Sequence, residues 1–253
     1  MVRIMSFNVL CYGNEEHFWT TRQEAVALAV KTVAPDSFGV QEAHKEWMDV
    51  LAALLPDYAY VGVGRDDGVD DGEFSAVFYL KNKYKAEESE TFWISETPDV
   101  PSRSWETACT RICTWAKLVN IETGESYVHM NTHLDHVSEL ARVNGVKMIK
   151  EKAASFGEIP VVCTGDFNVV QDTDCYVDMV SGNMGDARKL AESTTDKFTF
   201  HAFKPDKVHS IIDFVFIDRN TVKAIKFDVL DTQLCGNYYS DHYAVYADLE
   251  FIK

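Results

Sequence analysis

The chain alternates many short apolar segments, typical of β-strands, with only two long segments that show helical spacing of apolar residues. The two long helices are predicted at 20–33 and 138–156, far apart in the sequence. In the first of them, Ala25, Leu28 and Ala29 recur at that spacing. Since strands outnumber helices, this order favours packed sheets with helices covering their outer faces.

Most of the remaining sequence predicts strands. They are expected at 3–10, 38–41, 58–63, 75–80, 85–94, 111–120, 126–132, 159–164, 211–217, 224–230 and 242–251. Shorter helices are predicted at 46–55 and 172–179. Two loops stand out, an acidic Gly/Asp loop at 64–72 and a long irregular stretch at 95–110. No linker, low-complexity segment or repeat interrupts the sequence, which predicts a single domain over residues 1–253.

Composition limits the partners that this chain is expected to bind. A formal net charge of −16, without a Lys/Arg-rich stripe, disfavours a protein that holds long nucleic acid by its backbone. No apolar run approaches the ~20 residues of a membrane span, so no stable membrane association is expected. The sequence begins without a signal-peptide layout, and its scattered cysteines favour reduced thiols. We therefore expect a cytoplasmic protein, with no obligate protein partner evident.

Polar residues suited to chemistry follow the buried segment 160–163. The run Thr-Gly-Asp-Phe-Asn occupies 164–168, and positions two apart in an extended chain face the same way. Asp166 and Asn168 are therefore expected to point together, with Phe167 on the opposite face. Taken alone, this run is more typical of a Gly-Asp turn at a strand end.

Other predicted strands end in similar residues. His133 follows 126–132, and Asp241 and His242 stand at the start of the last strand. A lone histidine is more often structural, and an Asp-His pair is common by chance. The combination carries the weight, because a whole set of such residues lies at strand boundaries: Asn8, Glu42, His133, Asp166, Asn168, Asp213, Asp241 and His242.

Hydrolysis of a phosphate ester needs a set of this kind. A cation must offset charge on the phosphoryl oxygens, and Mg²⁺ prefers one or two carboxylates with water and substrate phosphate. Other groups must orient or deprotonate water and donate to the leaving oxygen. The sequence therefore predicts a phosphate-ester hydrolase with Mg²⁺ or Mn²⁺ as its cofactor.

Together and in this order, these residues resemble the endonuclease/exonuclease/phosphatase superfamily, which includes pancreatic-type deoxyribonuclease. The resemblance runs from the Ser-Phe-Asn of 6–8 to the Ser-Asp-His of 240–242. It implies an α/β fold, a four-layer αββα sandwich of two mixed, mainly antiparallel sheets packed face to face with helices outside. The stretch 92–98, continuing to 111–115, is similar to a bacterial, deadenylase-like subgroup of undefined substrate. The longer pattern that the inositol polyphosphate 5-phosphatases of this superfamily carry around their Gly-Asp-x-Asn element is not evident in this sequence.

The resemblance also implies a role for each residue. Glu42 would be the principal metal ligand, with Asn8 and Asp241 near the same cation. Asp166 would orient or deprotonate the attacking water, and Asn168 would hold that water or a phosphate oxygen.

The two histidines are implied to handle the phosphate and the leaving group. His242 would donate to the scissile phosphate, with its tautomer held by Asp213. His133 is similar to the second catalytic histidine, which binds phosphate or donates a proton to the leaving group. Glu73 is the expected carboxylate partner of His133.

Two arginines and two tryptophans are further candidates for substrate contact. Arg111 is similar to a phosphate-contacting arginine of the superfamily, since a bidentate fork suits phosphate. Arg65 is expected either to reach the substrate or to neutralise neighbouring acids of the 64–72 loop. Trp93 and Trp105 are candidates to stack a base or sugar or to anchor the core, and core packing is favoured for Trp93.

These expectations favour a phosphodiesterase or phosphatase acting on a small or single-stranded phosphate substrate, including a nucleotide or short nucleic acid. An endo- or exonuclease on DNA or RNA is the alternative within the same chemistry, and low basicity counts against it. A non-catalytic binding module is disfavoured, because the sequence contains the whole set of reactive residues that catalysis needs. A phosphodiesterase of membrane lipids would need a hydrophobic hairpin or basic patch, which the sequence does not show.

Overall fold

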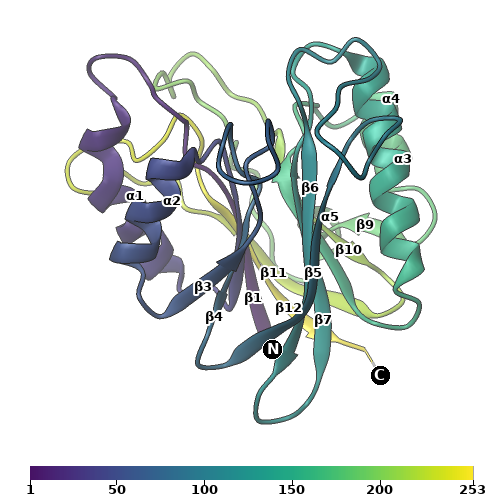
Figure 1. Ribbon diagram of the computed structural model, residues 1–253. Coiled ribbons are helices and arrows are strands. Elements are labelled where there is room, and N and C mark those ends of the chain that lie inside the picture. Colours follow the sequence, from purple (N-terminus) through teal and green to yellow (C-terminus); the bar gives the residue numbers. More distant parts are fainter. Residues whose placement is uncertain (253) are drawn as a thin grey trace.

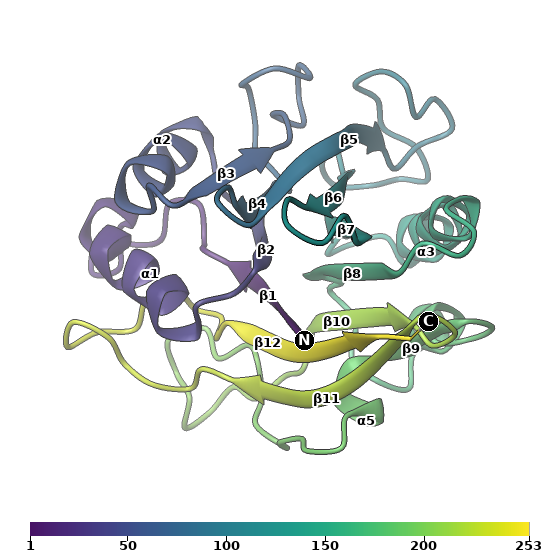
Figure 2. The ribbon, with the colours of Figure 1, turned by 90° about the horizontal axis from the view of Figure 1, so that it is seen from below.

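The computed structural model describes residues 1–252 and contains two six-stranded sheets packed face to face (Figure 2). The first has the order β11-β12-β1-β2-β4-β3, and the second has the order β5-β6-β7-β8-β10-β9. The strands of the first are β1 (Val2–Asn8), β2 (Ser37–Gln41), β3 (Tyr58–Val61), β4 (Val77–Leu80), β11 (Val222–Val229) and β12 (Val245–Phe251). Those of the second are β5 (Tyr84–Trp93), β6 (Ile112–Asn120), β7 (Ser126–His133), β8 (Val161–Asp166), β9 (Met184–Asp186) and β10 (Asp213–Asp218).

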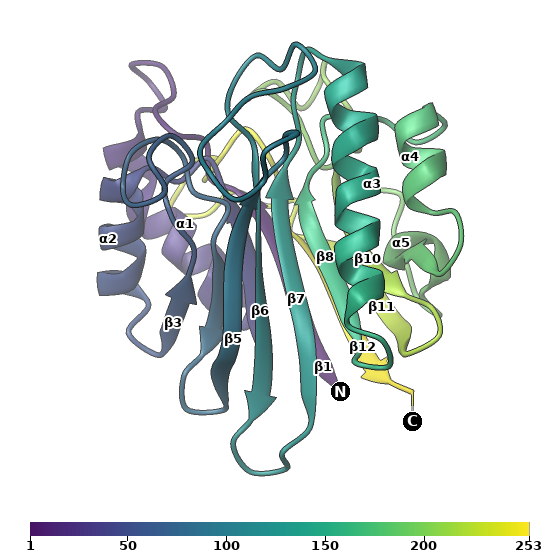
Figure 3. The ribbon, with the colours of Figure 1, turned by 45° about the vertical axis from the view of Figure 1, so that its right-hand side comes forward.

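Helices lie outside both sheets (Figures 1 and 3). α1 (Trp19–Val33) and α2 (Lys45–Leu54) cover the first sheet, and α3 (Glu139–Ser155) and α4 (Asp174–Met179) cover the second. The short α5 (Ala187–Leu190) adjoins β10 and β11. Each sheet mixes one parallel pair, β1–β2 or β7–β8, with antiparallel neighbours. The predicted four-layer αββα sandwich is therefore confirmed.

Some local features differ from the sequence-based expectation. β9 and α5 are not predicted, because segments so short show no periodicity. Helix α1 buries Ala25 and Ala29 as expected, but Leu28 is 39% exposed, whereas Arg22 and Val26 are also buried. Arg22 donates hydrogen bonds to the carbonyls of Val9 (2.6 Å) and Tyr239 (2.9 Å). Within residues 1–252, no helix is both long and apolar enough to cross a membrane.

Strand pairing brings the polar strand ends to one end of the sandwich. The parallel β1–β2 pair sets Asn8 opposite Gln41, directly before Glu42. The parallel β7–β8 pair sets His133 opposite Asp166, and antiparallel β10 sets Asp213 opposite Asp166 as well. Because parallel strands end at the same edge, residues far apart in the sequence meet there. The long loops rise at this same end, at the top of Figure 1.

A buried polar network connects the two sheets below that end. His129 of β7 contacts Ser37 of β2 through Nδ1 (2.7 Å) and Thr164 of β8 through Nε2 (2.9 Å). Burial lowers the pKa of His129 to about 3, so its ring is neutral. Asn131 accepts from the Gln41 amide at 2.7 Å, also across the sheets. These bonds satisfy polar groups within the core and hold the sheets in register.

Candidate active site

A cleft of about 350 Å³ opens where the polar strand ends meet. Its lining consists of Glu42, Arg65, Glu73, Cys109, Arg111, His133, His136, Asp166, Asn168, Phe200, Ile212, Asp241 and His242. Apart from the two candidate tryptophans, all predicted site residues are in this lining except Asn8 and Asp213, each of which hydrogen-bonds to a lining residue. The structure thus brings the whole predicted set together.

Asn8 connects the two carboxylates of the cleft. Its Nδ2 donates to Glu42 Oε1 (2.9 Å) and to Asp166 Oδ2 (3.1 Å). Its Oδ1 accepts from the backbone N–H of Leu10 (3.0 Å), so the amide nitrogen faces the carboxylates. The backbone N–H of Cys11 donates to the other oxygen of Glu42 (3.1 Å). In this arrangement Asn8 orients both carboxylates, and its role as a metal ligand stays a prediction.

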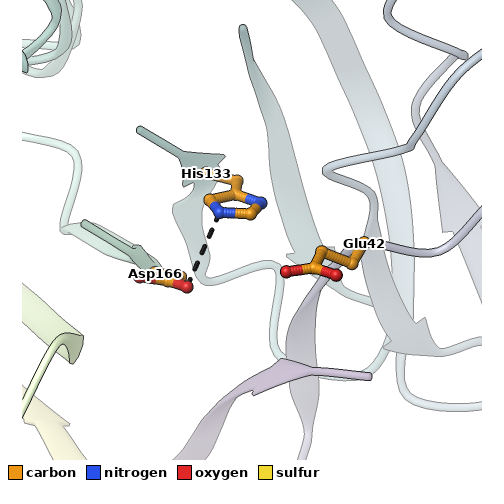
Figure 4. A group of neighbouring side chains, drawn as sticks. All are labelled: Glu42, His133 and Asp166. Atoms are coloured by element: carbon orange, nitrogen blue, oxygen red, sulfur yellow. Dashed lines mark ion pairs between the residues drawn. The ribbon is translucent and has the colours of Figure 1, made fainter. Parts of the chain in front are cut away.

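Asp166 lies at the centre of the cleft and is 1% exposed. Burial and the charge of Asp213 raise its pKa to about 7. Its Oδ2 lies 3.6 Å from His133 Nε2 and 3.7 Å from His242 Nε2. Figure 4 shows Glu42, His133 and Asp166 pointing toward one shared space. A carboxyl with a pKa near neutrality, between two imidazoles, is suited to accept a proton from water.

His242, which precedes β12 of the first sheet, is oriented by Asp213 at the start of β10 in the second sheet. Its Nδ1 lies 2.9 Å from Asp213 Oδ2, which leaves Nε2 on the side of Asp166. Burial opposes protonation of His242, but the charges of Asp213, Asp241 and Asp166 outweigh it and raise its pKa. The ring of Phe200 packs against His242 with a centroid distance of 4.7 Å. The predicted geometry of the His242–Asp213 pair is thus present in the structure.

His133 contacts Asn168 rather than forming a hydrogen bond with Glu73. Asn168 Nδ2 lies 3.0 Å from His133 Nε2 and also donates to the Leu134 carbonyl (3.0 Å). Glu73 Oε2 is 3.9 Å from His133 Nδ1, and that nitrogen has no hydrogen-bond partner within residues 1–252. Burial and the charges of Arg111 and Arg65 lower the pKa of His133. The ring is therefore neutral in the free protein.

Arg65 pairs with Glu73. Its two terminal nitrogens donate to both Glu73 oxygens, at 2.6 and 3.1 Å. Burial raises the pKa of Glu73, and the Arg65 charge opposes that effect. The pair lines the cleft, and in the described part of the chain Arg65 forms no ion pair with Asp66 or Asp67. Asp67 instead accepts backbone N–H groups within its own loop.

Arg111 is held by residues that the sequence analysis did not single out. It is 4% exposed, its Nη2 lies 3.0 Å from His136 Nδ1, and its Nε lies 3.6 Å from Asp135 Oδ2. Its Nε and Nη1 donate no hydrogen bond to any group within residues 1–252. Because Nε takes part in the ion pair with Asp135, Nη1 is the nitrogen left to bind an oxygen of an anion in the cleft.

Asp135 fastens the 95–110 loop to the site. It accepts from Thr107 Oγ1 (2.7 Å) and from the Ala108 N–H (2.9 Å) of that loop. It also accepts from the Ser138 N–H (2.7 Å) at the start of α3. The one feature of the sequence that points to Asp135 is its position two residues after His133, because alternate residues of an extended chain face the same way.

Neither candidate tryptophan lines the cleft. Trp93 is 6% exposed, and its Nε1 donates to the Arg65 carbonyl (2.7 Å). Trp105 packs against the apolar core beneath α3, and its carbonyl accepts from Ser138 Oγ (2.6 Å). Both therefore anchor loops that border the site, as the core-packing interpretation predicted for Trp93.

The site's donor atoms suit a hard divalent cation. One ligand atom each from Glu42, His133 and Asp166 lie within 4.8 Å of one another, and so do those from Asp166, Asp213 and His242. Glu42 and Asp213 both raise the pKa of Asp166, so negative charge is crowded here. A cation among these oxygens would offset that repulsion.

Comparison with known proteins identifies the family. Residues 5–242 match the model of the Endonuclease/Exonuclease/phosphatase family. The chain belongs to this family. Members of the endonuclease/exonuclease/phosphatase family are hydrolases that act on phosphoester bonds, generally with a divalent metal. The family predicted from the motifs is therefore confirmed.

Solved structures of other family members resemble this chain over its whole length. An endonuclease/exonuclease/phosphatase from Bacteroides vulgatus is 37% identical, with 99% of each chain covered and a TM-score of 0.93. A mannosyl-6-phosphatase from Bacteroides thetaiotaomicron is 32% identical, with 99% of this chain and 100% of that chain covered and a TM-score of 0.92. An uncharacterized protein of Acanthamoeba polyphaga mimivirus is 25% identical over 213 residues, which are 79% of this chain and 78% of that protein.

Proposed function

We propose that this protein is a Mg²⁺- or Mn²⁺-dependent phosphoesterase in which water attacks a small phosphate ester. The observation that carries the proposal is the position of Asp166, a buried carboxyl within 3.7 Å of the Nε2 atoms of two histidines. Arg111 and Arg65 line the same cleft. A proton acceptor, two imidazoles and two guanidinium groups around one small space suit phosphoryl transfer to water.

Glu42 would hold the cation, with Asp241 and Asn8 near it and the Asp166 carboxyl beside it. A divalent cation held there would offset negative charge on the phosphoryl oxygens and so assist attack by water. A cation nearby would also favour the ionised form of Asp166, because burial and the charge of Asp213 raise the pKa of this carboxyl to about 7 in the free protein.

The remaining steps are assigned to side chains of the protein. Asp166 accepts the proton of the attacking water, and Asn168 holds that water or a phosphate oxygen. His242, kept in orientation by Asp213, donates a hydrogen bond to the scissile phosphate. Arg111 offers its unpartnered Nη1 to the same phosphate. His133 donates a hydrogen bond to the leaving oxygen, and the proton that Asp166 removes from water returns to that oxygen through solvent.

The substrate that we favour is a phosphorylated sugar. The mannosyl-6-phosphatase from Bacteroides thetaiotaomicron resembles this chain at 32% identity over 99% of its length. The cleft of about 350 Å³ falls in the range of about 300–1,000 Å³ typical of small-molecule sites. The net charge of −16 disfavours long nucleic acid. An endo- or exonuclease is the second candidate, because it would use the same cleft.

A substrate panel tests this proposal. We would measure hydrolysis of mannose 6-phosphate, a dinucleotide and single-stranded RNA with Mg²⁺ and with Mn²⁺, and repeat the panel with His242→Ala. We expect the sugar phosphate to be hydrolysed with the highest kcat/KM and the variant to be strongly impaired. Faster hydrolysis of RNA would favour the nuclease. Equal rates in wild type and His242→Ala would contradict the mechanism.

A further inference from the structure

A second polar recess, of about 320 Å³, lies beside the catalytic cleft. Arg65 and Glu73 line both spaces, so their ion pair is the common wall between them. Trp93 helps to fix the position of Arg65, because its Nε1 donates a hydrogen bond to the Arg65 carbonyl. The cleft and the recess therefore adjoin at the Arg65–Glu73 pair.

Three segments that border the first sheet enclose the recess. They are the β1–α1 loop with Tyr12, the start of α2 with His44, and the β3–β4 loop with Asp70 and Asp71. Figure 1 shows both loops rising at the same end of the sandwich. The β1–α1 loop also contacts the cleft directly, because its Cys11 N–H donates to Glu42. The recess is thus built onto the proposed metal-binding side of the cleft.

Tyr12 provides an aromatic surface at the recess. Its ring is stacked on His44, with a centroid distance of 4.8 Å and an interplanar angle of 25°, yet the residue is 56% exposed. His44 below it is only 7% exposed, and its Nε2 has no hydrogen-bond partner in the described chain. An exposed ring held flat by a buried neighbour can pack against the C–H face of a sugar.

Carboxylates supply the hydrogen-bond acceptors of the recess. Asp67 Oδ1 accepts the N–H groups of Val69 and Asp71 and so fixes the shape of the loop. Asp70, on the same loop, is exposed, and its carboxylate accepts no hydrogen bond within residues 1–252. Hydroxyl groups can donate to such carboxylates. A second phosphate would be repelled, because the carboxylates of the lining (Glu46, Asp70, Asp71 and Glu73) outnumber its cations (Lys45 and Arg65).

We infer that this recess binds the neutral, polyhydroxylated part of the substrate, a sugar ring, with Tyr12 and Asp70 as specificity-determining residues. The inference rests on the proposed phosphoesterase function for its link to turnover. The phosphate occupies the cleft, the Arg65–Glu73 pair lies beneath the bond between phosphate and sugar, and the ring lies against Tyr12. The recess thereby selects sugar phosphates over simple alkyl phosphates.

Relative rates on two substrates test this assignment. The measured quantity is the ratio of kcat/KM for mannose 6-phosphate to that for ethyl phosphate, which lacks the sugar ring. Tyr12→Ala and Asp70→Asn should each lower this ratio about ten-fold, the effect of losing one good contact. Tyr12→Phe, which keeps the ring, should preserve it. Asp99→Asn makes the same change of charge on an exposed residue outside both spaces, and should leave both rates unchanged.

Binding of free mannose, followed by NMR, provides a second measurement that does not depend on catalysis. Wild-type protein should bind the sugar, and Tyr12→Ala and Asp70→Asn should weaken binding about ten-fold, as for the ratio of rates. Wild-type protein that binds no mannose, or variants that bind it equally well, would overturn the assignment of the recess. An unchanged ratio in both variants would overturn it as well. Mannose binding without hydrolysis of any ester would instead overturn the proposed phosphoesterase function and leave the recess assignment supported.

Discussion

Strands β7 and β8 carry buried polar side chains in two different settings. In the middle of the sandwich, His129 and Thr164 bond to each other at 2.9 Å, and the other nitrogen of His129 contacts Ser37 at 2.7 Å. Further along the same strands, His133 and Asp166 line the cleft. There His133 Nδ1 has no hydrogen-bond partner among residues 1–252, and the Asp166 carboxyl is crowded by like charges.

The difference shows what separates a structural polar core from a reactive site. Burial is the same in both settings, since His129 is 0% exposed and Asp166 is 1% exposed. In the interior network the protein itself supplies partners for the His129 ring. In the cleft, polar atoms and negative charge are left for a ligand and a cation to satisfy. Changes at the two places should therefore affect different properties of the protein.

The largest effect is expected for Asp166→Asn. Removing the proton acceptor should lower kcat by about 10²–10⁴-fold, the usual contribution of a general base. The fold should persist, because Asn keeps an oxygen that can accept from the Asn8 amide. Steady-state kinetics and circular dichroism measure the two effects. A kcat within two-fold of wild type would remove Asp166 from the mechanism.

His129→Ala should show the opposite pattern. The change leaves a cavity and removes one partner each from Ser37 and Thr164, so the free energy of unfolding should fall by about 3 kcal/mol. The folded fraction should keep the wild-type kcat, because His129 does not line the cleft. Urea denaturation and activity at matched folded concentration measure both. A large loss of kcat without loss of stability would contradict the division between the two settings.

Metal binding should distinguish the settings in a third way. Mn²⁺ at about 100 times its dissociation constant should raise the free energy of unfolding by about 2.7 kcal/mol. Glu42→Ala should abolish this increase, and His129→Ala should retain it despite its lower starting stability. Thermal unfolding with and without Mn²⁺ provides the measurement. An equal increase in Glu42→Ala would place the cation elsewhere.

The smallest expected effect is a pH dependence that originates in the interior network. The pKa of His129 is about 3 in the folded protein, against about 6.5 in an unfolded chain. As the pH falls below 6.5, the unfolded state takes up the proton first, so folded stability is lost. This residue should account for about 2 kcal/mol of the loss between pH 7 and pH 5. His129→Gln should remove that share, and parallel pH profiles for wild type and variant would refute it.

Residue pattern alone predicts much of this architecture. The alternation of apolar residues indicates the main strands and the two long helices, and the polar residues that end these strands do meet in one cleft. The pairing that brings His133 and Asp166 together joins residues far apart in the sequence. The family resemblance implied that these two residues share a site, but the pairing itself was not predicted, because local periodicity contains no information on which strands are neighbours.

Other features depend on the paths of loops, which no periodicity determines. Glu73 was expected to partner His133. The 64–72 loop instead places Arg65 within hydrogen-bond distance of Glu73, and these two residues pair. Asp135 has its role only because the 95–110 loop folds over it. The orientation of the Asn8 amide follows from the turn after β1, where the Leu10 N–H donates a hydrogen bond to Asn8 Oδ1. Contacts of this kind become visible only in the folded chain.

The most direct test of the account is the metal dependence of phosphate release from mannose 6-phosphate. Wild-type protein would be treated exhaustively with a chelator, and the rate would then be followed as Mn²⁺ or Mg²⁺ is added back. We predict a rate near background without metal and a saturable recovery on addition, with no recovery in Asp166→Asn. An undiminished rate in the chelated protein would contradict the central claim that this cleft hydrolyses phosphate esters with a bound divalent cation.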